Sequence, residues 1–171
     1  MIIRNATLAD LDALVHLSAT TMREAFGPPH NPIEWVDAYI AESLTPAILA
    51  AELQDPKAQY FVVETDAGQA VGYAKVRRNP PPRRMVERRS LEIQRIYLLE
   101  SHIGGGLGRK LMDHCRAYAA EKGYRAVYLG VWERNERAKA FYVRLGFKPF
   151  GWHAFQFGPD RQRDIWMENE L

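Results

Sequence analysis

The sequence contains one cysteine, Cys115, among its 171 residues. A single cysteine excludes both an intramolecular disulfide and a zinc site built from cysteine ligands. It falls on the apolar face of an expected helix, where we do not expect a nucleophile. Long apolar runs are also missing: no stretch approaches the ~20 residues of a membrane span, and the first residues lack the pattern of a signal peptide. We therefore expect a cytoplasmic protein without a membrane partner.

An excess of one charge is absent as well. The chain carries 23 basic and 21 acidic residues, a net charge of +2, so its overall field does not favour nucleic acid as a partner. Six arginines nevertheless gather in residues 77–89, around the proline-rich stretch 79–82. This cluster is compatible with an anion-binding hairpin or a nucleic-acid binder, but we favour a solvated loop. The 5 histidines show no i, i+4 pair, so we expect no metal.

Length and composition are those of an ordinary globular chain. With 47% hydrophobic and 26% charged residues, the sequence predicts a single domain over residues 1–171 with a sizeable core. Apolar residues recur at helical spacing in some segments and alternate in others. The expected helices span residues 8–17, 33–44, 46–53, 107–119 and 138–145, and the expected strands span residues 2–3, 60–63, 70–74, 91–98, 127–131, 150–157 and 163–168.

A glycine-rich segment separates strand 91–98 from the helix that follows it. Four glycines stand within five positions: Gly104, Gly105, Gly106 and Gly108. One glycine is enough for a tight turn, whereas several place bare N–H groups at a helix N-terminus, which favours a phosphate group. The spacing fits neither the P-loop nor the dinucleotide G-x-G-x-x-G motif. The order strand, loop, helix, strand predicts a βαβ unit with parallel strands.

These residues resemble the GNAT superfamily of acyl-CoA-dependent N-acetyltransferases. Gly106 and Gly108 match the two glycines of the family signature, while Ile103 stands where the family usually has Arg or Gln. The family's second segment, an Asn followed seven residues later by a Tyr, is similar to Asn135 and Tyr142. The resemblance covers nearly the whole chain. It implies an α/β (α+β) GNAT fold, with a mixed, mostly antiparallel sheet of about seven strands, helices on both faces and one parallel βαβ unit.

The resemblance also implies acetyl-CoA as co-substrate. In the family, the glycine loop binds the phosphates, and the strand before it binds the pantetheine arm as an added strand would. The cofactor-binding positions implied in this sequence are Ile96, Tyr97, Leu98, Gly104, Gly105, Gly106, Leu107, Gly108, Arg109, Asn135 and Tyr142.

Direct acetyl transfer to an amine requires a base and an acid. An alkyl ammonium with a pKa near 10.4 must first lose a proton, which costs about 4.6 kcal/mol at pH 7. We expect Glu92 to accept this proton, because it matches a fourth-strand glutamate of some members and strict alternation places it on the face of Ile96. Other members carry a base where this chain has Gly130. Glu92 could equally be an ion-paired carboxylate, with Arg95 as its partner. Tyr142 is expected to donate a proton to the departing thiolate.

The acceptor is less clearly defined. The segments LEIQRIYLL, LGVWERNERAKAFYVRLGF and GWHAFQFGPDRQRDIWMENEL are most similar to the PaiA-type subgroup, whose members acetylate polyamines, so we expect a small-molecule amine partner. His153, Gln162 and Asp164 match that subgroup without an assigned role. Four carboxylates of the first two long helices suit a polycation or form a solvated face, which we favour: Glu24, Glu34, Asp37 and Glu42.

Several alternatives remain open. The acceptor can instead be a protein N-terminus, a lysine or an amino acid. Outside the enzymes, the chain can be a catalytically silent sensor that binds acyl-CoA. We expect a monomer or a homodimer.

Overall fold

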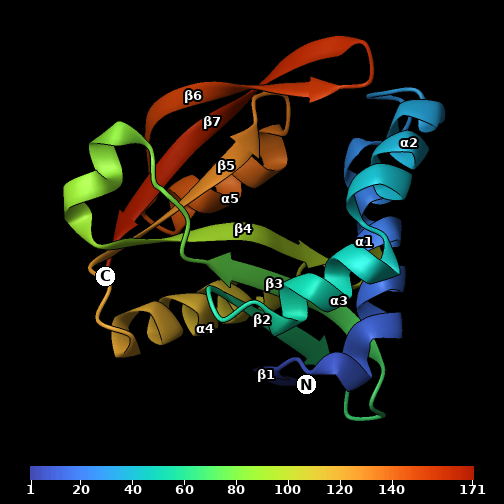
Figure 1. The fold of residues 1–171 in the computed structure, drawn as a ribbon, viewed down its shortest axis with the longest axis horizontal. Coiled ribbons are helices and arrows are strands. Elements are labelled where there is room, and N and C mark those ends of the chain that lie inside the picture. Colours follow the sequence, from blue (N-terminus) through green and yellow to red (C-terminus); the bar gives the residue numbers. More distant parts are fainter.

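The computed structural model describes residues 1–171 and is built around one mixed seven-stranded sheet (Figure 1). The strands lie in the order β1-β2-β3-β4-β5-β7-β6, and all neighbours are antiparallel except the parallel pair β4 and β5. Their bounds are β1 (Ile2–Asn5), β2 (Ala58–Glu64), β3 (Ala70–Arg77), β4 (Ser90–Leu98), β5 (Ala126–Trp132), β6 (Lys148–Phe157) and β7 (Asp160–Glu170). The predicted mixed sheet with its parallel βαβ unit is confirmed.

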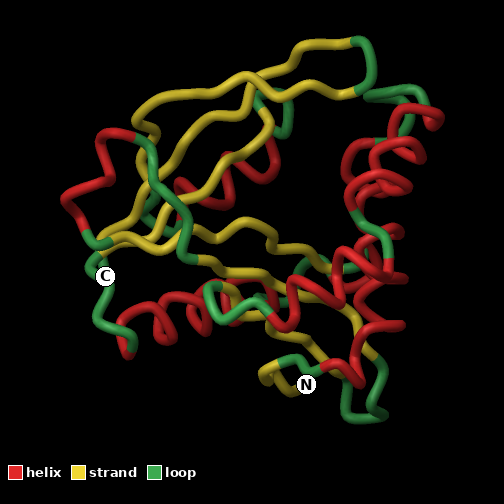
Figure 2. Tube along the Cα trace, in the orientation of Figure 1, coloured by secondary structure: helices red, strands yellow, loops and turns green.

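Helices cover both faces of this sheet (Figure 2). They are α1 (Leu11–Phe26), α2 (Ile33–Ser43), α3 (Pro46–Gln54), α4 (Leu107–Glu121) and α5 (Glu136–Arg144). On one face, Leu14 of α1, Val36 of α2 and Leu49 of α3 pack against Tyr60 and Tyr73 of the sheet. None of the helices has the length and apolar content that crossing a bilayer requires.

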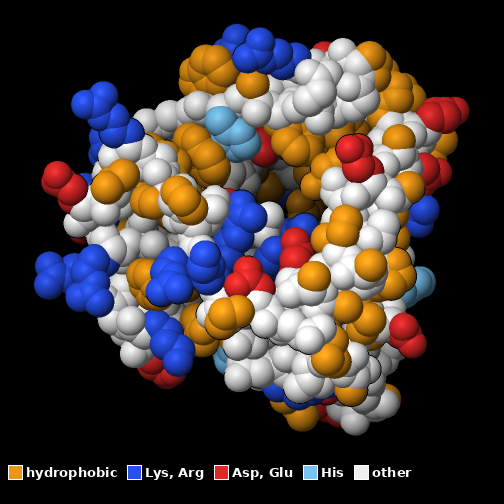
Figure 3. Space-filling model, viewed as in Figure 1, with side chains coloured by type: hydrophobic (Ala, Val, Ile, Leu, Met, Phe, Trp, Pro, Cys, Tyr) orange, Lys and Arg blue, Asp and Glu red, His pale blue; other side chains and the backbone are white.

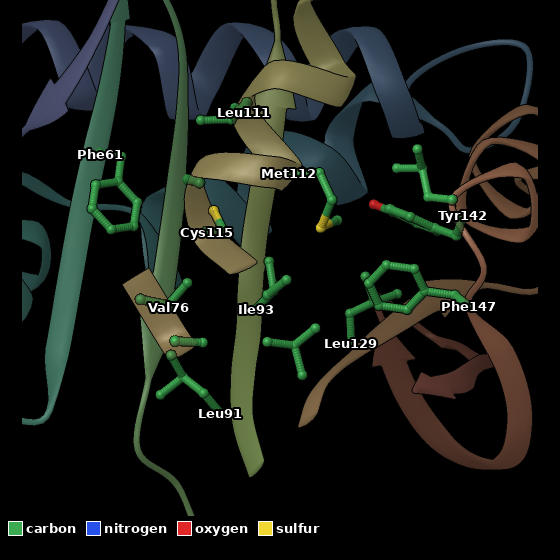
Figure 4. Packing of buried hydrophobic residues seen from close by; sticks show 14 of the residues in the cluster. Phe61, Val76, Leu91, Ile93, Leu111, Met112, Cys115, Leu129, Tyr142 and Phe147 are labelled. Atoms are coloured by element: carbon green, nitrogen blue, oxygen red, sulfur yellow. The ribbon is translucent and has the colours of Figure 1, made fainter. Parts of the chain in front are cut away.

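Helices α4 and α5 cover the opposite face (Figure 4). Leu111 and Cys115 of α4 and Tyr142 of α5 join Ile93 and Leu129 in the larger apolar cluster. The hydroxyl of Tyr142 points from α5 toward α4 (Figure 4). Neighbouring residues of each strand thus serve two separate cores, one on each face.

Helix starts follow the local signals of the sequence. Thr7 and Asp10 form a capping box at the short 3-10 helix η1 (Leu8–Asp10), which leads into α1. Thr45 caps α3 by accepting a hydrogen bond of 3.2 Å from the N–H of Ile48. Because both helices are capped where they begin, only short connections lead into α1 and α3 beside the sheet.

A β-bulge in β4 overturns the expected alternation. Lys75 pairs with Arg95 but Val76 pairs with Ile93, so Gln94 is an extra residue on β4. The bulge reverses which side each later residue faces. Glu92 therefore shares a face with Arg95, and the prediction that it shares a face with Ile96 was wrong. The inserted residue is the physical cause, because strict alternation holds only along an unbroken ladder.

Strands β4 and β5 pair over only a short distance. Three residue pairs join them, and the last is Glu92 with Tyr128. Beyond this pair, β4 stays hydrogen-bonded to β3 and β5 to β7, while β4 and β5 diverge. We call this divergence the splay. It opens a gap between two central strands of the sheet.

The arginine-rich segment is more ordered than the solvated loop that we expected. It contains the 3-10 helix η2 (Arg83–Arg88), in which Met85 is fully buried. Arg84 and Arg88 each lie 3.0 Å from a carboxylate oxygen of Glu168 on β7. The protein itself therefore neutralises part of this positive charge.

Candidate active site

A cleft of about 950 Å³ passes through the sheet at the splay. At one end it reaches the loop before α4, and we call this part the glycine-loop end, lined by Gly104, Gly105, Gly106, Gly108, Arg109 and Phe141. At the other end it reaches α1, α2 and the β6–β7 hairpin, and we call this part the aromatic end, lined by Phe26, His30, Tyr39, Trp132, Phe155 and Trp166. In Figure 3 the molecule is hollowed between the β6–β7 hairpin and the helices α1 and α2, with acidic and basic side chains around the hollow.

The glycine loop presents free backbone donors to the cleft. Gly104, Gly105 and Gly106 have φ angles of 111°, 55° and 79°, a region that glycine enters without strain. A Cβ added at any of them would meet nothing within 4 Å, so the loop borders open space. The N–H groups of these glycines, of Gly108 and of Arg109 donate to no acceptor within the protein. Unpaired donors at the start of α4 fit the phosphates of CoA.

Leu107 differs from the other loop residues predicted to bind the cofactor. Its side chain is buried in the apolar cluster under α4. Its N–H donates to the carbonyl of Gly104 over 3.3 Å, so this donor is already used. Leu107 anchors the loop, while its neighbours face the cleft.

Strand β4 exposes a hydrogen-bonding edge to the splay. Ile96, Tyr97 and Leu98 pair with β3 on one side and line the cleft on the other. β5 does not pair with them. A ligand with amide groups can therefore bind to this edge as an added strand would.

Asn135 and Tyr142 both line the cleft from α5 and its cap. The side chain of Asn135 accepts a hydrogen bond of 3.0 Å from the N–H of Ala138, so it caps α5. Tyr142 is only 8% exposed, and its hydroxyl makes no hydrogen bond within the protein. Burial, with a smaller contribution from Cys115, raises the pKa of Tyr142 well above its usual value. The phenol is therefore a protonated donor at neutral pH.

Glu92 lines the cleft but is held in an ion pair. Both of its oxygens accept hydrogen bonds from Arg77, at 2.5 Å from Nε and 3.3 Å from Nη2. The partner that the sequence suggested, Arg95, binds elsewhere, so that pairing was wrong. Glu92 stands opposite Arg77 in the β3–β4 ladder, whereas Arg95 stands opposite Lys75 and reaches Glu52 of α3.

Arg95 belongs to a charged network that the sequence analysis missed. It donates to both oxygens of Glu52 on α3, at 2.7 Å and 3.3 Å. The Nζ of Lys75 also lies 2.7 Å from Glu52, and the hydroxyl of Tyr60 donates to the same carboxylate. The carboxylate of Glu52 thus compensates the positive charges of Arg95 and Lys75. No sequence spacing links α3 to β4, and the one available signal was a charged residue inside an apolar strand.

The pKa values in this network follow from burial and pairing. Burial lowers the pKa of Lys75 to about 8, although Glu52 opposes this shift. Burial alone would raise the pKa of Glu52, but hydrogen bonds and charge from Arg95, followed by Lys75, outweigh it and lower the pKa to about 2. Glu52 is therefore ionised throughout the neutral range.

The acidic residues expected at the acceptor site are mostly elsewhere. Of the four carboxylates of the first two long helices, Glu24 alone lines the cleft, where it accepts a hydrogen bond of 2.9 Å from the N–H of Glu100. Asp37 forms an exposed ion pair with Arg23. Glu34 and Glu42 are exposed on α2.

The C-terminal residues without an assigned role do reach the cleft. His153, Gln162 and Asp164 all line its aromatic end. Gln162 is buried and bonded to Asn31 at 2.8 Å, whereas His153 and Asp164 remain partly exposed to the cleft. The structure therefore brings two titratable groups to this end that sequence reasoning could not place.

Cys115 lies away from this chemistry. It is fully buried in the cluster under α4 and does not line the cleft. Burial raises the pKa of its thiol to about 12. A protonated, inaccessible thiol is a poor nucleophile. No group of His, Cys, Asp and Glu in the structure is arranged to hold a metal ion.

Comparison with known proteins agrees with this geometry. Residues 18–147 match the acetyltransferase (GNAT) family. An uncharacterized N-acetyltransferase of Lactobacillus delbrueckii subsp. lactis is 32% identical over 162 residues, which cover 95% of this chain and 92% of that protein. An uncharacterized N-acetyltransferase of Mycobacterium tuberculosis is 33% identical over 164 residues, which cover 96% of this chain and 99% of that protein.

A solved structure shows the same fold. The PaiA N-acetyltransferase of Thermoplasma acidophilum, in complex with coenzyme A, superposes with a TM-score of 0.80 at 18% identity, over 99% of this chain and 98% of that one. This chain belongs to the GNAT family and is an N-acetyltransferase that uses acetyl-CoA.

Proposed function

We propose that this protein transfers an acetyl group from acetyl-CoA directly to a primary amine, with polyamines as the first class of acceptor. The observation that carries the proposal is the cleft itself, which joins the glycine-loop end to the aromatic end through the splay. Both substrates can then be bound at once, one from each face of the sheet. A ternary complex needs no acyl-enzyme, and the buried Cys115 offers no nucleophile for one.

The glycine-loop end would hold the CoA portion. The amides of Gly104, Gly105, Gly106, Gly108 and Arg109 would bind the phosphates. When bound, acetyl-CoA supplies an acetyl group activated as a thioester. The β4 edge at Ile96, Tyr97 and Leu98 would fix the pantetheine arm along the splay.

Two kinds of protein group would move the protons. The neutral phenol of Tyr142 would donate to the departing sulfur. A carboxylate of the cleft, Glu92 or Asp164, would accept a proton from the ammonium. Asn135 would support the role of Tyr142 by starting α5 at the position that brings this residue to the splay.

The aromatic end suits a cationic alkyl chain. Aromatic rings attract an ammonium through their faces, and Phe26, Tyr39 and Trp132 line this end. The basic residues Arg77 and Arg95 are each paired with a carboxylate and so repel a cation less than free arginines would. Glu24, Glu100 and Asp164 also line the cleft, and none of these carboxylates forms an ion pair with Lys or Arg.

The test is an acceptor screen that follows thiol release. Purified protein is incubated with acetyl-CoA and, separately, with polyamines, amino acids and peptides with a free N-terminus. We expect fastest release with a polyamine, and mass spectrometry should show one added acetyl group on it. Faster release with an amino acid or a peptide would move the acceptor to that class. Tight CoA binding without release for any amine would identify a silent sensor instead.

A further inference from the structure

Gly130 leaves room for other side chains beside the splay. On β5, Val127, Leu129 and Val131 face the apolar cluster under α4, so Gly130 faces the aromatic end. A Cβ at Gly130 would lie 3.3 Å from Nε2 of His153 and 3.6 Å from Cβ of Asp164. These two side chains therefore occupy the space into which a longer residue at position 130 would project.

His153 and Asp164 lie next to each other and together offer two hydrogen-bond acceptor atoms. They face each other across the β6–β7 ladder, and Nε2 of His153 lies 3.7 Å from Oδ2 of Asp164. The Nδ1 atom of His153 lies 3.2 Å from the carbonyl of Ala154, which can accept only if Nδ1 carries the proton. Nε2 of the neutral ring then has a free lone pair. At this separation, one ammonium nitrogen can lie within hydrogen-bond distance of both atoms.

We propose that Asp164 is the base that deprotonates the acceptor amine and that Nε2 of His153 holds the same nitrogen in place. The inference rests on the proposed function, since it assigns a residue to the proton transfer which that function requires. Both residues line the cleft, and both are partly exposed to it, at 35% for His153 and 23% for Asp164. A substrate nitrogen at the aromatic end can therefore reach them.

The ammonium nitrogen loses two protons in one turnover. The ammonium gives one proton to Asp164, and the neutral amine nitrogen forms a C–N bond to the acetyl carbon as the C–S bond breaks. The nitrogen loses a second proton in forming the amide. One proton ends on the departing sulfur, supplied through Tyr142, and the other passes from Asp164 to solvent.

The surroundings of Asp164 favour proton uptake. Burial raises its pKa and the charge of Glu133 raises it further, whereas a proton on His153 would oppose both. Tyr39, from α2, also interacts with Asp164. A carboxylate with a raised pKa is a stronger base than an ordinary one.

Glu92 is less able to take this role. Both of its oxygens accept from Arg77, whereas Asp164 has no guanidinium or lysine partner. Each of these bonds uses a lone pair of an oxygen that would otherwise be free to accept a proton. Glu92 would therefore act mainly by fixing Arg77 and the end of the β4–β5 ladder.

The experiment compares Asp164→Asn with two matched substitutions. Asp113→Asn removes the same charge on α4, away from the cleft, and Glu92→Gln removes the competing carboxylate. We expect Asp164→Asn to lower kcat by about 10²-fold to 10⁴-fold, the usual contribution of a general base. Polyamine binding without acetyl-CoA, measured by calorimetry, should weaken at least about tenfold in Asp164→Asn. Asp113→Asn should match the wild type in both measurements.

The pH profile separates a base from a structural residue. In the wild type, kcat/KM should fall as the pH drops through the pKa of Asp164. In Asp164→Asn this acidic limb of the pH profile should be lost. The value of kcat/KM should then rise with pH toward the pKa of the amine, near 10.4. Asp164→Glu should keep the wild-type limb at reduced kcat, and it replaces Asp164→Asn if that variant does not fold.

The outcomes are distinct. If the wild type acetylates no amine, the proposed function fails and the inference falls with it. If the wild type is active and Asp164→Asn keeps its kcat and pH limb, the inference alone is overturned. If Glu92→Gln loses the limb instead, the base is Glu92.

Discussion

The side-chain amide of Gln162 donates from Nε2 to Oδ1 of Asn31 over 2.8 Å, and both residues are buried. Asn31 in turn donates from Nδ2 to the carbonyl of Phe26 over 2.7 Å. This chain of hydrogen bonds joins β7 to the end of α1. It holds the β6–β7 hairpin, with His153 and Asp164, over the aromatic end of the cleft.

Gln162→Ala should therefore loosen the hairpin. The substitution leaves the buried Oδ1 of Asn31 without a donor, so we expect a loss of about 1 to 3 kcal/mol in unfolding free energy. The KM of the acceptor should rise more than that of acetyl-CoA. Gln156→Ala, on the exposed part of the same hairpin, is the control and should change neither. Urea unfolding and steady-state kinetics measure both effects, and equal changes in the two KM values would contradict this role.

Tyr142→Phe should lower turnover about 10²-fold while changing CoA affinity only slightly. Stability should be little affected, because the hydroxyl makes no hydrogen bond within the protein. Since burial raises the pKa of Tyr142, its proton should remain in place up to about pH 10, and no alkaline loss of activity should come from it below that pH. Tyr118→Phe, on α4 outside the cleft, serves as the control. Wild-type turnover in Tyr142→Phe would remove this residue from the mechanism.

Gly106→Val should abolish measurable CoA binding. Gly106 has a φ of 79°, so a β-branched residue strains the loop and moves its amides, and the added side chain enters the space where the phosphates would lie. Gly68→Val is a matched control, because Gly68 has a φ of 78° and similarly open surroundings in the turn between β2 and β3. Calorimetry with CoA should show binding in the control only. Retained affinity in Gly106→Val would argue against the loop as the phosphate site.

Glu52→Gln should destabilise the protein in a pH-dependent way. The pKa of Glu52 is lowered from 4.5 to about 2, so its stabilising contribution is fully present above pH 4.5 and is lost as the pH falls through 2. The stability difference between wild type and variant should be large at pH 7 and shrink progressively below pH 4.5. Glu42→Gln, on the exposed side of α2, should show no such trend. Urea unfolding at several pH values checks the prediction, and a constant difference would show that the charge of Glu52 is unimportant.

Local sequence signals were sufficient for most of the fold. The capping residues Thr7 and Asn135 marked helix starts, and the glycine loop marked the parallel unit. The bulge at Gln94 was not predictable, since any residue can be the extra one and the choice depends on how β4 pairs with β3. It changed which residues of β4 share a face. The partners of Glu92 and Arg95 follow from their neighbours in space, Arg77 of β3 and Glu52 of α3.

The site was predictable where it depends on backbone, and unpredictable where it depends on contacts distant in sequence. The free amides of the loop follow from glycine spacing alone. The pairing of Arg95 with Glu52, and of His153 with Asp164, requires knowing which strands and helices become neighbours. The sequence contains both pairs but not their proximity.

The splay also bears on strand pairing between molecules. A strand with unpaired backbone groups is normally a template for aggregation, and here two such strands lie inside the molecule. Helices α4 and α5 cover them on one side, and the wedge between them closes at Glu92 and Tyr128. Because of this cover and this closed end, a second polypeptide has less access to these groups than to an exposed edge strand. The fold thus keeps these unpaired backbone groups away from the outer edges of the sheet, where strands of other molecules could pair with them.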